Sequence, residues 1–169
     1  ECQRALATKP GYVEAHSDLD STLQKAGRVP EATREFEEAL RIDPRNLVAL
    51  NNLGVIYWQD KKWSEAETYF RRAAQVASDD VDVHCNLGLV FMQENRAQDA
   101  VGQYEQALRI DPHSINAHNS LGDAMIQLHR WPEAQSEFQE VLQLDPTDGN
   151  ALQKLGQLQG LQITVPVAK

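Results

Sequence analysis

The sequence of 169 residues contains few aromatic residues and almost no cysteine. Phe, Trp and Tyr together make up 7% of the chain, so a core must be built mainly from Leu, Ala, Val and Ile. Its two cysteines, Cys2 and Cys85, form neither a metal-binding motif nor a disulfide framework. No glycine-rich phosphate loop occurs either. We therefore expect no metal site and no cofactor.

Basic residues are also in deficit, with 16 Lys and Arg against 25 Asp and Glu, which gives a net charge of −9. Nucleic acids and anionic membrane surfaces both attract basic faces, so neither is an expected partner. No apolar run approaches the roughly 18 residues of a membrane-spanning helix, which argues against membrane insertion. No signal peptide is visible, but the chain begins at Glu1, and the cell compartment stays open.

What the sequence does contain is a repeat. A Leu-Gly pair recurs every 34 residues without insertion or deletion, at Leu53-Gly54, Leu87-Gly88, Leu121-Gly122 and Leu155-Gly156. Three further columns keep this step: Ala32, Ala66, Ala100 and Ala134; Phe36, Phe70, Tyr104 and Phe138; and the Asp-Pro pairs that begin at Asp43, Asp111 and Asp145. A period of this length with these columns is the signature of tetratricopeptide arrays.

Each column has a physical reason. A glycine inside a helix costs roughly 1 kcal/mol of helix propensity, which only the close approach of a neighbouring helix can offset. The large side chains of the Phe70 column fill the space between repeats. Proline disfavours the α conformation in the residue before it, so Asp-Pro ends a helix. The pattern predicts first helices at 13–26, 47–60, 81–94 and 115–128, and second helices at 30–42, 64–77, 98–110 and 132–144.

The chain is thus identified as a member of the tetratricopeptide repeat family over residues 1 to about 160. The resemblance implies an all-α, right-handed superhelical solenoid of antiparallel helix pairs. Four full repeats span 13–46, 47–80, 81–114 and 115–148, residues 1–12 match the second helix of a truncated repeat, and residues 149–160 match a capping helix. The segment from Leu50 to Tyr57 most resembles the repeat arrays of O-GlcNAc transferases and related bacterial proteins.

The same resemblance implies that the first helices line a concave groove. The predicted partner-binding residues are Val48, Asn51, Asn52, Val55, Trp58, Asn86, Leu89, Met92, Asn119, Asp123 and Ile126. Asn52 and Asn86 match an asparagine ladder that holds extended peptide, since an amide offers a donor and an acceptor together. The apolar members should remain open, and an open apolar patch usually marks an interaction site.

The groove is nearly free of basic residues. Chaperone adaptors of this family use a basic clamp for a carboxylate, and the matching places here carry Ser17, Ser21, Asn52, Asp82 and Asn86. No chaperone clamp is therefore expected. Acidic side chains on the inner face, at Glu14, Asp18, Asp82 and Asp123, favour a neutral to basic protein or peptide instead.

Two recurring polar columns are interpreted as structural. His16, His84 and His118 lie on different repeats, too far apart to share a metal, and are expected to pack half-buried. Arg28, Lys62, Arg96 and Arg130 precede the second helices and are interpreted as solvated turn residues. No arrangement of catalytic residues is found.

The sequence therefore predicts a non-catalytic scaffold that binds a protein or an extended peptide. Two alternatives stay open. The array could be the substrate-recruiting arm of a transferase whose catalytic domain lies outside it, or a self-assembling structural scaffold. Residues 161–169 are predicted to be extended or disordered, and their β-branched residues suggest a tail that can dock on a repeat surface and support self-association.

Overall fold

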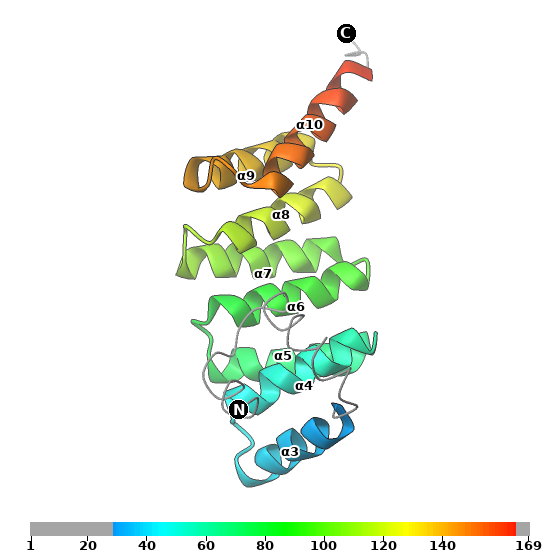
Figure 1. The fold of residues 1–169 in the computed structure, drawn as a ribbon, viewed down its shortest axis with the longest axis vertical. Helices are drawn as coiled ribbons and strands as arrows, with labels where there is room; N and C mark the ends of the chain where they lie inside the picture. The colour runs from blue at the N-terminus through cyan, green and yellow to red at the C-terminus, as the bar shows by residue number, and fades with distance from the viewer. Residues whose placement is uncertain (1–28, 165–169) are drawn as a thin grey trace.

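The computed structural model describes residues 29–164, with side chains as far as Gly160. This part of the chain is entirely helical. Its elements are α3 (Val29–Ile42), α4 (Leu47–Gln59), α5 (Trp63–Val76), α6 (Val81–Gln93), α7 (Ala97–Ile110), α8 (Ile115–Gln127), α9 (Trp131–Leu144) and α10 (Gly149–Thr164). Figure 1 shows them stacked in chain order along one axis, each packed mainly against the helices before and after it. The predicted all-α helical array is confirmed.

The first helices begin at side-chain caps. Asn46, Asp80 and Ser114 precede α4, α6 and α8, and each accepts a hydrogen bond from the backbone N–H three residues later. Such a cap satisfies one of the N–H groups that a helix start leaves unpaired. Asp80 supplies it where the sequence lacks the Asp-Pro pair, so the turn between the second and third repeats is as well defined as the others.

The first helices end at a left-handed residue. Lys61, Asn95 and His129 have φ values of 59°, 58° and 58°, again 34 residues apart. The next N–H in each case reaches back to a carbonyl five residues earlier, at distances of 2.8–2.9 Å, which is the Schellman arrangement. Glycine is the usual residue there, because other L-residues are strained by roughly 1–2 kcal/mol. This chain carries that strain in three successive repeats.

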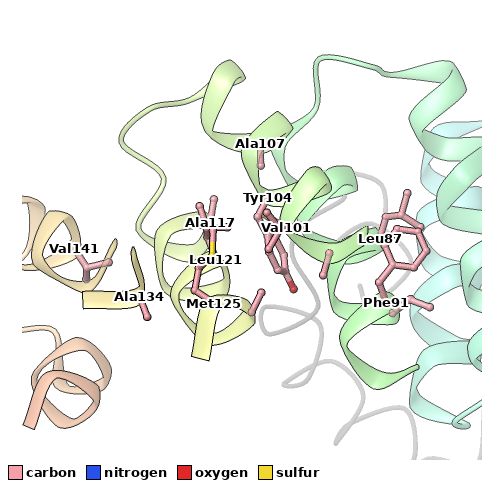
Figure 2. Packing of buried hydrophobic residues seen from close by; sticks show 14 of the residues in the cluster. Leu87, Phe91, Val101, Tyr104, Ala107, Ala117, Leu121, Met125, Ala134 and Val141 are labelled. Carbon is pink, nitrogen blue, oxygen red and sulfur yellow. The ribbon is translucent and has the colours of Figure 1, made fainter. Parts of the chain in front are cut away.

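The core follows the glycine column. Phe70, Tyr104 and Phe138 are fully buried, and each ring lies against the glycine of its own repeat. A methyl group added at Gly54 or Gly122 would come within 2.6 Å of a ring carbon. Figure 2 shows the cluster running from Leu87 and Phe91 past Tyr104 to Val141.

The predicted helix bounds agree with the structure to within one residue from 29 to 144. One boundary was wrong, because α10 continues to Thr164 instead of ending at Gly160. Gly160 only weakens a helix, and Pro166 disfavours the α conformation no earlier than residue 165. The predicted helix at 13–26, the half repeat at 1–12 and residues 165–169 lie outside the described part.

Candidate partner-binding surface

The predicted groove residues all lie on α4, α6 and α8, and contacts at the end of the array show which way they face. Asn150 on α10 donates to the side-chain oxygen of Asn119 at 3.0 Å, and Lys154 forms an ion pair with Asp123 at 2.5 Å. Residues of α8 predicted to face inward therefore meet the next first-type helix. We call this the inner face, defined by the eleven predicted partner-binding residues and their equivalents on α10.

On α4 the inner face is more buried than predicted. Asn51, Asn52 and Val55 are only 2%, 4% and 5% exposed, while Val48 is half-buried. The Asn52 amide donates to the carbonyl of Val48 at 2.7 Å, within its own helix. The expectation that Val55 stays open is wrong, because its side chain belongs to the main hydrophobic cluster together with Cys85 and Leu87 of the next repeat.

The inner face of α6 shows the same difference between polar and apolar positions. Cys85 and Asn86 are fully buried, whereas Leu89 and Met92 are half-buried at the edge of the core. Burial raises the pKa of the Cys85 thiol to about 12, and the nearby carboxylates of Asp82 and Asp80 raise it further. The thiol is therefore protonated at neutral pH and is a poor nucleophile.

Towards the C-terminal end the inner face is more open but already engaged. Asn119, Asp123 and Ile126 are half-buried on α8. Asn119 and Asp123 contact α10 through Asn150 and Lys154, so a partner at this end would have to displace these contacts or bind beside them. The partly exposed apolar stripe is formed by Trp58, Leu89, Met92 and Ile126.

Trp58 contributes both an apolar surface and an unsatisfied polar atom. Its ring meets Trp63 edge-on, with centroids 5.9 Å apart, and packs against the core. Within the described part of the chain, its buried indole N–H has no hydrogen-bond partner, and neither does the amide nitrogen or oxygen of Asn51. Buried polar groups are nearly always paired in folded proteins, so three unpaired atoms on one helix call for an explanation.

The histidine column is structural, as predicted. His84 contacts the side-chain oxygen of Gln103 at 2.9 Å and the carbonyl of Ser78 at 3.1 Å. His118 makes the same two contacts one repeat later, with Glu137 at 2.7 Å and the carbonyl of Pro112 at 3.0 Å. Each imidazole thus joins the turn before its helix to the second helix of its repeat. The hydrogen bond from Glu137 raises the pKa of His118. His16 lies outside the described residues.

The arginine column was misjudged at one position. Arg96 is not a free turn residue, because its guanidinium pairs with Glu94, Asp99 and, on the preceding repeat, Glu67, at 2.8–3.0 Å. It also lies over the ring of Phe91, 4.3 Å from the centroid. The local spacing of Arg96 and Asp99 was visible in the sequence, but the link to Glu67 spans 29 residues. Arg28 lies outside the described residues.

Over residues 29–160 no three His, Cys, Asp or Glu side chains are grouped so that they could hold a metal ion. None of the described helices is both long and apolar enough to span a membrane.

Comparison with known families gives two overlapping matches. Residues 45–113 and 91–159 each match a family model described as Tetratricopeptide repeat, so that together the two models cover the chain from 45 to 159. No curated protein matches the chain significantly.

Solved structures share the fold at low sequence identity. MamA superposes with a TM-score of 0.77 at 18% identity, over 83% of this chain and 82% of its own. The first repeat domain of Spaghetti (RPAP3), solved bound to the HSP90 peptide SRMEEVD, gives 0.68 at 18% identity, over 72% and 97%. The OM64 repeat domain from Arabidopsis gives 0.64 at 23% identity, over 68% and 94%.

Proposed function

Because this chain belongs to the tetratricopeptide repeat family, we propose that it is a non-catalytic scaffold whose inner face binds an extended segment of a partner protein. Modules of this family are generally protein-interaction modules, and similar structures have been solved with peptides bound. The match to the repeat arrays of O-GlcNAc transferases, carried by Leu50 to Tyr57, makes the amides of Asn52 and Asn86 part of this proposal.

The observation that carries the proposal is the set of unpaired polar atoms on α4. Asn51 has an amide N–H donor and an oxygen acceptor without partners, and Trp58 has an indole N–H donor without one. A buried polar atom without a partner costs about 1–3 kcal/mol. A peptide backbone offers both a carbonyl and an N–H, so it could pair with these atoms while its side chains cover the apolar stripe.

Charge selects the class of partner. None of the inward positions on α4, α6 and α8 carries Lys or Arg, and Asp82 and Asp123 contribute carboxylates. An extended segment of neutral to basic character therefore fits this face. The HSP90 peptide bound to Spaghetti (RPAP3) ends in Glu-Glu-Val-Asp, which the inner face should repel.

The test uses the full chain against an array of defined octapeptides that vary in charge and in apolar content, followed by measured affinities for the best binders. We expect neutral and basic peptides to bind and SRMEEVD to fail. Asn51→Cys keeps the side-chain size and copies the residue at the equivalent position of the next repeat, Cys85. It should weaken peptide binding at least several-fold and also raise the urea midpoint of the free protein, because it removes two unpaired buried atoms.

Two further variants complete the design. Trp58→Phe keeps an aromatic ring and deletes only the indole N–H, so it should weaken the same peptides. Gln139→Ala on the exposed side of α9 is the control and should change neither binding nor stability. Unchanged affinities in both inner-face variants, or preferential binding of SRMEEVD, would refute the proposal.

A further inference from the structure

A cleft opens on the opposite side of the array from the inner face, between the second-type helices α7 and α9. Its volume is about 610 Å³, within the range of small-molecule and side-chain binding pockets. The floor is apolar and made by Leu108, Leu121 and Met125, and charged side chains stand around it, among them Glu105, Arg130 and Glu137. Leu121 and Met125 are 3% and 4% exposed, so the floor is a fixed part of the core.

The neighbouring junction shows what normally occupies this place. Between α5 and α7, one repeat earlier, Phe91 stands where Met125 stands in the cleft, and Arg71 and Arg96 replace Glu105 and Arg130. Both guanidinium groups lie over the Phe91 ring, at 5.4 and 4.3 Å from its centroid. An aromatic ring with cations over it therefore fills that junction.

The junction between α3 and α5 is filled in the same way. Tyr57 holds the equivalent position, stacks on Tyr69 with centroids 5.3 Å apart, and has the Lys62 ammonium 5.5 Å from its ring. Of the three junctions described between successive second-type helices, only the one at Met125 has no aromatic side chain of its own. The repeat thus provides an aromatic position that this junction leaves empty.

We propose that the cleft between α7 and α9 is a second partner-binding site, distinct from the inner face, that takes an aromatic side chain of a partner protein next to a basic residue. The ring would lie against the Met125 thioether and beside the Arg130 guanidinium, both favourable neighbours for an aromatic face. Arg130 is held in place by Glu133 at 3.1 Å.

The rim specifies the basic neighbour. Glu137 is engaged by His118, whereas Glu105 forms no ion pair with any other described residue. Glu105 is exposed, and it replaces the arginine that closes the equivalent junction. A partner Lys or Arg beside the aromatic residue would restore at this rim the pairing of opposite charges that the chain lacks.

The two methionines of the sequence allow both surfaces to be observed separately. Met125 lies in the cleft and Met92 on the inner face, so the full chain labelled with ¹³C at its methionine methyl groups reports each by NMR. We expect acetyl-Arg-Phe-Gly-amide to move the Met125 methyl signal by ring-current shielding and to leave Met92 in place. The control peptide acetyl-Arg-Leu-Gly-amide should cause no such shift.

Variants then exchange the properties of the two junctions, with saturation transfer to the peptide's phenyl protons as the readout. Met125→Phe fills the cleft with the residue of the preceding repeat and should reduce peptide affinity at least tenfold. Glu105→Arg, an exposed change that cannot threaten the fold, should also reduce it severalfold. Phe91→Met should open the α5–α7 junction and add a second binding event.

Three results would overturn the proposal: no shift at Met125, a shift confined to Met92, or undiminished saturation transfer in both Met125→Phe and Glu105→Arg. A shift confined to Met92 would place the peptide on the inner face instead.

Discussion

Gly88 on α6 tests the packing that holds each repeat together. A Cβ placed there would lie 2.7 Å from Cζ of Tyr104 and nearer still to the adjacent ring carbon, whereas ordinary contacts begin at 3.4 Å. The ring is fully buried and has no free space to move into. Gly88→Ala therefore forces an overpacked junction, at a cost of about 1–3 kcal/mol.

Two other glycines provide matched controls. A Cβ at Gly102, in the middle of α7, or at Gly156, the equivalent of Gly88 on α10, meets no atom within 4 Å. Alanine at either position should gain up to about 1 kcal/mol of helix propensity. All three substitutions share this gain, so the difference between Gly88→Ala and Gly102→Ala isolates the packing cost and should be about 1–3 kcal/mol.

The assay is urea unfolding of each full-length variant, followed by circular dichroism. The midpoint of Gly88→Ala should lie below that of the wild type, and that of Gly102→Ala at or above it. Gly88→Leu should be lower again, because the larger side chain meets the same ring. Equal midpoints for Gly88→Ala and Gly102→Ala would show that the ring does not depend on the missing side chain.

Three further predictions concern the polar columns. The pKa of His118 is raised in the folded state by Glu137, so its stabilisation is complete below the unfolded pKa of about 6.5 and is lost as the pH rises through the folded value; Glu137→Gln, which copies the His84 pair, should reduce the excess of the urea midpoint at pH 6 over that at pH 8. Lys61→Gly relieves a left-handed φ and should stabilise by about 0.5–1 kcal/mol in the same assay, and a loss of stability would contradict that reasoning. Arg96→Met keeps an apolar side chain over Phe91 but removes the ion pairs, so it should cost less than about 1 kcal/mol in dilute buffer, and a cost that persists in 1 M NaCl would show that charge is not the cause.

The helices could be predicted almost to the residue because their signals are local and repeated. A cap, a glycine, a buried ring and a helix stop each depend on residues within one repeat, and the constant period tests every assignment against its equivalents. The one boundary that failed, at α10, lies where the array has no further repeat against which to compare it.

The surface could be predicted less well because it is decided between repeats. Arg96 with Glu67 and Asp123 with Lys154 are pairs about 30 residues apart, and a column of equivalent residues does not reveal which partner stands across a junction. The burial of Asn51, Asn86 and Val55 is of the same kind. The period indicates the face on which these side chains lie, but their exposure depends on what packs over that face.

The cleft at Met125 illustrates the same limit. Its column holds tyrosine, phenylalanine and methionine in turn, all of which are ordinary core residues in a sequence pattern. Only the positions of Arg71 and Arg96 over Phe91 reveal that the aromatic members complete a junction. The absence of such a ring at Met125 becomes informative only by comparison with them.

The constant spacing also determines how a gene for such a chain can change in length. Removing residues 81–114 would join Asp80 to Ile115, and Asp80 would then cap α8 as it now caps α6. Glu67 would face Arg130, the equivalent of its present partner Arg96. A deletion of any other size within the array would turn every later helix away from the rings and glycines it must meet. Duplication or loss of coding sequence is therefore tolerated here in units of 102 nucleotides, three for each of the 34 residues in a repeat.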